Sequence, residues 1–128
     1  MKVAFGFLAL ALASAPAFAT PGERLADGIY NGPAISVTVQ KTVVKVQLGC
    51  AHGEFANNKL NYENHFGGHG WIQSDMLTFP PPPKEPATYT GFVSVSGAVT
   101  LYIHRDKQRT VQEYHVTKDA QFNFLRCK

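Results

Sequence analysis

Residues 35–48 read ISVTVQKTVVKVQL, and apolar residues alternate with polar ones along both halves of this stretch. If the chain turns back at Lys41-Thr42, Val39 lies opposite Val44 and the aliphatic side chains share one face. Such alternation is typical of antiparallel strands that bury a single face. The stretch therefore predicts a β-hairpin, whose aliphatic face is continued by two further pairs, Val37 with Val46 and Ile35 with Leu48.

A second hairpin is predicted around Ser96-Gly97, because a serine–glycine pair favours a tight turn. With two turn residues at this place, Phe92 lies opposite Leu101. Four further segments have the composition of strands, namely residues 60–62, 71–79, 110–116 and 121–126.

Two irregular segments separate these predicted strands. Residues 64–70 read NHFGGHG, and this density of glycine predicts a loop. Residues 80–83 are all proline, which cannot donate hydrogen bonds to a strand ladder. They predict an extended connection of the polyproline type on the surface.

The pattern as a whole gives about eight short strands and almost no helical periodicity. A sheet of this kind loses its exposed edges when it closes on itself, so we expect a small antiparallel up-and-down β-barrel. A two-sheet β-sandwich is the alternative. Residues 20–128 contain no internal boundary and are expected to form a single domain.

Residues 1–19 are typical of a secretory signal peptide. The basic Lys2 precedes an apolar run at residues 3–12, and Ala17-Phe18-Ala19 matches a small-x-small cleavage site. This run is too short to span a bilayer, and no later stretch is long enough. We expect an exported protein, periplasmic or secreted, with no integral membrane segment; a buried N-terminal helix is the alternative.

The composition is that of a globular protein, with 45% hydrophobic and 16% charged residues in a chain of 128. The formal net charge of +3 is modest, and basic and acidic residues are interspersed. This pattern argues against a nucleic-acid partner. We expect a monomer.

Catalytic motifs are missing from the sequence. It has no Gly-x-Ser-x-Gly nucleophile elbow and no glycine-rich phosphate loop that opens a helix. The nine acidic residues are scattered and form no local carboxylate pair. We expect that the protein is not an enzyme.

Cys50 and Cys127 are the only two cysteines. Because an exported protein enters an oxidising compartment, we expect a disulfide between them. This bridge would close the long loop between residues 50 and 127. In the chain-entropy model, closing such a loop stabilises the fold by about 4 kcal/mol. Two free, buried thiols are the alternative.

The chain has five histidines, which are its most concentrated candidates for metal binding. His65 and His69 flank two glycines, and His52 lies two residues after Cys50. Imidazole nitrogens bind zinc or copper, so these three histidines are candidate metal ligands. The alternative is solvated histidines without a ligand, because the four-residue spacing suits a helix and this stretch is not helical.

Three aromatic residues, Tyr62, Phe66 and Trp71, lie in or beside the glycine-rich segment. At the rim of a barrel they are candidate contacts for a small apolar or anionic ligand, or for a protein. Burial beneath a loop is the alternative. Basic residues also cluster in the predicted turn at 105–109, where they would steer an anionic partner or simply be solvated.

Residues 48–55 read LGCAHGEF, residues 87–91 read ATYTG after the proline-rich crossing, and residues 122–128 read FNFLRCK. These segments resemble a group of small exported bacterial β-barrel proteins of unknown function, which carry a Cys-Ala-His-Gly segment and a C-terminal Arg-Cys. The resemblance covers most of the chain after the signal peptide and implies a barrel and a disulfide, but no reaction. By overall plan the chain is also similar to periplasmic lysozyme inhibitors, which implies a protein-interaction function.

Three functions follow as hypotheses. The first is an exported, non-enzymatic binding module for a small ligand, which requires an internal cavity that side chains do not fill. The second is a protein-interaction module, such as an inhibitor of an envelope-directed enzyme. Its barrel interior would be filled, and its activity would lie in a loop such as residues 65–71. The third is zinc or copper binding through the three histidines.

Overall fold

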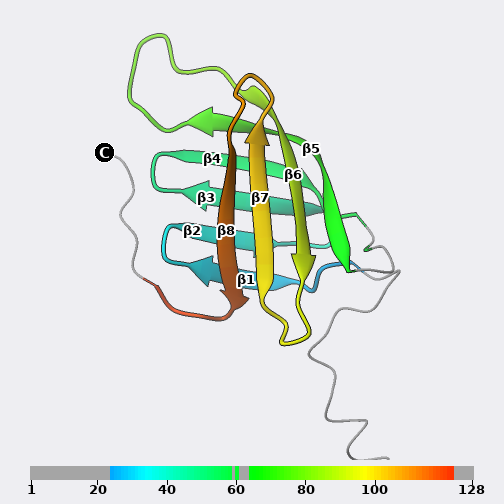
Figure 1. Cartoon of the computed structure of the whole chain (residues 1–128). Coiled ribbons are helices and arrows are strands. Elements are labelled where there is room, and N and C mark those ends of the chain that lie inside the picture. Colours follow the sequence, from blue (N-terminus) through cyan, green and yellow to red (C-terminus); the bar gives the residue numbers. More distant parts are fainter. Residues whose placement is uncertain (1–23, 59, 61–63, 123–128) are drawn as a thin grey trace, which may run out of the picture.

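The computed structural model describes residues 24–58, 60 and 64–122, which form a closed barrel of eight antiparallel strands (Figure 1). Each strand pairs with the next one along the chain, and β1 pairs with β8 to close the barrel. The prediction of a barrel is therefore confirmed. The strands are β1 (Gly28–Gly32), β2 (Ile35–Val39), β3 (Val43–Leu48), β4 (Ala51–Ala56), β5 (His65–Ser74), β6 (Glu85–Val93), β7 (Val99–Arg105) and β8 (Val111–Lys118).

The first predicted hairpin is confirmed in its register. Val39 lies opposite Val44, and the two pairs that continue the aliphatic face form as expected between β2 and β3. These aliphatic side chains all face the barrel interior and are buried. Alternation along the sequence was therefore sufficient to predict which face of this hairpin is inside.

The second predicted hairpin forms between β6 and β7, but its predicted register was wrong by one residue. Phe92 lies opposite Thr100 instead of Leu101. The cause is a longer turn, in which the backbone N–H of Ser94 donates to the carbonyl of Ala98 at 2.8 Å. Because side chains alternate between faces, a shift of one residue exchanges the inner and outer sets.

The glycine-rich residues predicted as a loop belong mainly to β5, so that prediction was wrong. Gly67 and Gly70 lie where neighbouring strands approach closely, and a Cβ atom there would overlap the carbonyl oxygen of Tyr89 or Glu54. Glycine in a strand interior permits such a close backbone approach. Here the glycines mark tight strand packing instead of a turn.

Other predicted strands have mixed outcomes. The strand predicted at residues 71–79 ends at Ser74, and β1 and β4 were not predicted at all. Leu60 is not in a strand, and the rest of the predicted segment 60–62 lies outside the described residues. The predicted segment 121–126 begins without strand structure and continues outside the described residues, where the predicted signal peptide also lies.

Side chains pack closely in the part of the barrel interior around Phe55. Phe55 stacks on Tyr89 with ring centroids 4.6 Å apart, and on Phe66 with centroids 6.2 Å apart. The enclosed space bordered by Phe55, Phe66 and the aliphatic residues around them has a volume of about 10 Å³. That is close to the least volume that can hold one water molecule. Among the described residues, this part of the interior leaves no room for a ligand.

The buried phenol of Tyr89 makes the fold sensitive to alkali. Its side chain is 0% exposed and donates its hydroxyl to the carbonyl of Trp71 at 2.8 Å. Burial raises the pKa of Tyr89 well above its ordinary value, although Arg105 acts in the opposite direction.

We expect the free energy of unfolding to fall as pH rises above about 10, because the unfolded chain then releases a proton that folded Tyr89 retains. Tyr89→Phe should reduce this loss by about 1.4 kcal/mol per pH unit. At neutral pH the same variant should be about 1 kcal/mol less stable, since it lacks the hydroxyl hydrogen bond. Urea unfolding at a series of alkaline pH values measures both effects, and equal slopes for the two proteins would contradict the expectation.

Candidate functional site

The loop between β5 and β6, residues 75–84, extends away from one end of the barrel and is drawn in yellow-green in Figure 1. Near its tip Met76 is 59% exposed, Leu77 is 90% exposed and Phe79 is 99% exposed. Residues 76–83 contain no charged side chain. Single exposed apolar residues are ordinary, but a contiguous set of them marks an interaction site. We call Met76–Phe79 the apolar tip.

Hydrogen bonds tie both halves of this loop to the barrel. The backbone N–H of Asp75 donates to the carbonyl of Cys50 at 2.9 Å, and Gln73 Nε2 donates to the carbonyl of Pro82 at 2.7 Å. The four consecutive prolines fix their own φ angles. The loop therefore has little conformational freedom to lose when it binds a partner.

Asp75 connects the loop to the outer face of the barrel. Its Oδ1 accepts a hydrogen bond from His52 Nδ1 at 2.5 Å, and its Oδ2 accepts one from Gln47 Nε2 at 2.9 Å. The His52 ring also lies at 89° to the Trp71 ring, with centroids 5.4 Å apart. The hydrogen bond to Nδ1 fixes the orientation of the imidazole and leaves Nε2 as its second polar atom.

Asp75→Ala should loosen the loop, since His52 loses the carboxylate that it bonds to, and Gln47 loses one acceptor but keeps its bonds to the carbonyls of Leu48 and Ala51. We expect the free energy of unfolding to fall by about 1–3 kcal/mol, and the backbone amides of the apolar tip to exchange faster with deuterium. Asp106→Ala is a matched control, because its carboxylate accepts from the exposed Thr88 hydroxyl instead. Unchanged exchange at the tip in Asp75→Ala would show that the side chain does not anchor the loop.

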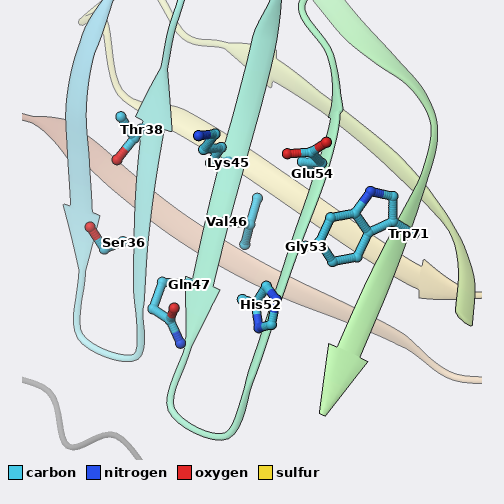
Figure 2. A pocket seen from close by; sticks show the side chains of 9 residues that line it. All are labelled: Ser36, Thr38, Lys45, Val46, Gln47, His52, Gly53, Glu54 and Trp71. Carbon is cyan, nitrogen blue, oxygen red and sulfur yellow. The ribbon is translucent and has the colours of Figure 1, made fainter. Parts of the chain in front are cut away.

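A depression of about 370 Å³ lies on the outer face of β2 to β5, beside this hydrogen-bond network (Figure 2). Half-buried polar side chains and one aromatic ring dominate its lining. The Lys84 ammonium lies over the Trp71 ring, 4.1 Å from its centroid. The side chains that point outward here are Ser36, Thr38, Lys45, Gln47, His52, Glu54 and Trp71.

The structure separates the aromatic residues that were predicted to act together. Trp71 is half-buried on the outer face, whereas Phe66 packs against the core beside Phe55. Both residues belong to β5, where side chains alternate between the two faces, so they cannot share one contact surface. Tyr62 lies outside the described residues.

The three histidines predicted as metal ligands do not converge. His52 bonds to Asp75, His65 lies against the Phe92 ring at 5.6 Å, and His69 is 3.4 Å from a threonine hydroxyl of β6. Within the described part of the chain, no three His, Cys, Asp or Glu side chains gather as a metal site. Zinc or copper binding stays a prediction, and the positions of His52, His65 and His69 do not support it.

Cys50 lies in the turn between β3 and β4, while Cys127 is outside the described residues. The disulfide therefore stays a prediction. No helix in the described ranges is long and apolar enough to cross a membrane.

Sequence reasoning did not identify the apolar tip or Asp75 as functional. It extended a strand through Phe79, because this segment is rich in apolar residues. Two signals for a loop were present, namely the aspartate, which is depleted in strands, and the proline run that follows. The predicted basic turn lies beside the start of β6, just after this loop, because the backbone N–H of Asp106 donates to the carbonyl of Pro86 at 3.1 Å.

No family model matches this chain, and neither a curated protein nor a solved structure is significantly similar to it.

Proposed function

We propose that this chain is an exported, non-enzymatic protein-interaction module that binds its partner through the apolar tip. The partner is an enzyme directed at the cell envelope, and lysozymes are the first class to test. The observation that carries the proposal is the exposure of Leu77 and Phe79, 90% and 99%, on a loop that is hydrogen-bonded to the barrel at both ends.

The close packing around Phe55 supports this function over a ligand site in that part of the barrel interior. Barrels that hold small molecules enclose a cavity for them. Here the enclosed space among the central side chains is about 10 Å³. A closely packed core instead provides a rigid support for a binding loop.

The composition of the apolar tip suits a cleft on another protein. The centres of protein interfaces are rich in aromatic residues and methionine and poor in charge, and their rims are polar. Met76, Leu77 and Phe79 would form such a centre. The β7–β8 turn lies beside this loop (Figure 1), and its Lys107 would belong to the rim. The proline run lowers the entropy that is lost on binding.

The proposal is tested by titrating lysozymes of different structural types with protein purified from the periplasm, while cell-wall lysis is followed by turbidity. We expect inhibition of at least one type at a near-stoichiometric ratio. Full activity of every type in the presence of excess protein would remove lysozymes as the partner class.

A further inference from the structure

We infer that the outer face of β2 to β5 carries a second binding site, for an uncharged, hydroxyl-rich ligand of the saccharide class. The site lies on the wall of the barrel, beside the base of the β5–β6 loop, where Asp75 bonds to His52, and its ligand is distinct from the proposed protein partner. It consists of the depression in Figure 2 and a second depression next to it.

The two depressions form one elongated surface. The second has a volume of about 280 Å³ and extends toward Thr42 and His69. Glu54 and Trp71 line both depressions, so they lie at the centre of the combined surface. A surface of this shape suits a chain of several linked rings better than one compact molecule.

The lining combines hydrogen-bond donors with acceptors. Ser36 and Thr38 present hydroxyls, Lys45 presents an ammonium group and Glu54 presents a carboxylate. Each hydroxyl of a sugar can both donate and accept, so it can bond to either kind of group. The indole of Trp71 adds an apolar surface on which the C–H face of a sugar ring can pack.

The charges in the lining favour an uncharged ligand over an anion. Lys45 lies directly opposite Glu54 across β3 and β4, so each charge is balanced by the other. An anion beside Lys45 would also lie beside the Glu54 carboxylate. An apolar ligand is equally disfavoured, because the outward-facing apolar side chains of the two depressions are only Trp71 and the smaller Val43 and Ala56.

The groups at the centre are held in place before any ligand binds. The Asp75 carboxylate orients His52, and the Lys84 ammonium packs on one face of the Trp71 ring. Beneath the surface, the Tyr89 hydroxyl donates to the Trp71 carbonyl. Such preorganisation reduces the entropy cost of binding.

Trp71 is the single tryptophan of the chain, so its fluorescence reports on this site directly. The test is a titration of the whole protein with chitotetraose, cellotetraose and maltotetraose, followed by tryptophan fluorescence and calorimetry. We expect a saturable change with at least one of these sugars and no change with inorganic phosphate. A response to phosphate alone, or to none of the three sugars at millimolar concentration, would overturn the inference.

Two variants locate the binding on this face. Trp71→Ala should weaken sugar binding by about ten-fold in calorimetry, while Tyr102→Ala, an aromatic change on the outer face of β7, should leave it unchanged. Lys45→Met removes an exposed donor without touching the core, and it should weaken binding about three-fold or more. Lys107→Met is its control. Unchanged affinity in both Trp71→Ala and Lys45→Met would refute this location even if sugar binds.

Discussion

The double variant Leu77→Ser and Phe79→Ser is expected to weaken the inhibitory complex at least about a hundred-fold. Each of these side chains would pass from nearly full exposure into an apolar cleft, and complete burial of such a side chain is worth about 1.5–3 kcal/mol. The fold itself should be unaffected, because substitutions of exposed side chains without partners change stability by about 0.5 kcal/mol or less. Inhibition titrations and urea unfolding of the same preparations separate the two effects.

Val95→Ser is the matched control for this variant. Val95 is 83% exposed, so it loses a comparable apolar side chain, but it lies in the β6–β7 turn at the opposite end of the barrel. We expect inhibition by Val95→Ser to equal that of the unsubstituted protein. If both variants inhibit equally well, the apolar tip is not the contact surface.

Gly53→Ala is expected to lower the free energy of unfolding by at least about 3 kcal/mol. Gly53 points inward from β4, where an added Cβ would overlap the Tyr89 hydroxyl and the Trp71 carbonyl oxygen. Tyr89 is fully buried and stacked on Phe55, so it has no free space to move into. Overpacked cores that cannot relax lose stability in this way.

Gly68→Ala provides the matched control for Gly53→Ala. A Cβ at Gly68 meets only the amide nitrogen of Asn58, at 3.2 Å, and this side chain can move aside. We expect a loss of less than about 1 kcal/mol, typical of a substitution outside the core. Thermal or urea unfolding measures the stability of the two variants. Equal stability of both would mean that the core around Gly53 can accommodate a Cβ atom.

The fold could be predicted where alternation alone determines which face is inside. In the hairpin of residues 35–48, every second residue is aliphatic, and the strand pairs formed as expected. The β6–β7 hairpin shows the limit of this method. Both of its faces are partly apolar, so its register depended on the length of the turn, which residue types do not determine uniquely.

Glycine was the main source of error in the fold prediction. The same residue type marks a turn and a close approach between strands, and only the neighbouring strand distinguishes the two. At Gly67 the close neighbour is the carbonyl oxygen of Tyr89, and at Gly70 it is the carbonyl oxygen of Glu54. Each of these neighbours is distant in sequence from the glycine that it approaches. A local pattern could not have placed β5 here.

The candidate site was predicted only in part. Trp71 was predicted as a contact residue and lines the depression on the outer face, but Phe66 packs against the core instead, and Tyr62 lies outside the described residues. The hydrogen bond between His52 and Asp75 joins residues 23 apart along the chain. It depends on where β5 ends relative to β4, and that is a property of the closed barrel.

The barrel wall and the loop have separate roles in this proposal. The wall is stabilised by the buried core of the described residues, so it can carry side chains on its outside without loss of core packing. The loop exposes apolar side chains that would contribute more to stability if they were buried. This loss of stability has a function if a partner covers the exposed side chains.

The most direct test of partner binding places a photoreactive phenylalanine analogue at position 79 and, in a second variant, at position 95. Cells that produce each variant are irradiated, and the covalent products are identified by mass spectrometry. We expect position 79 to crosslink to one envelope-directed protein and position 95 to give no such product. Crosslinks from position 79 to lipid alone, or the same products from both positions, would contradict docking of a protein partner on the apolar tip.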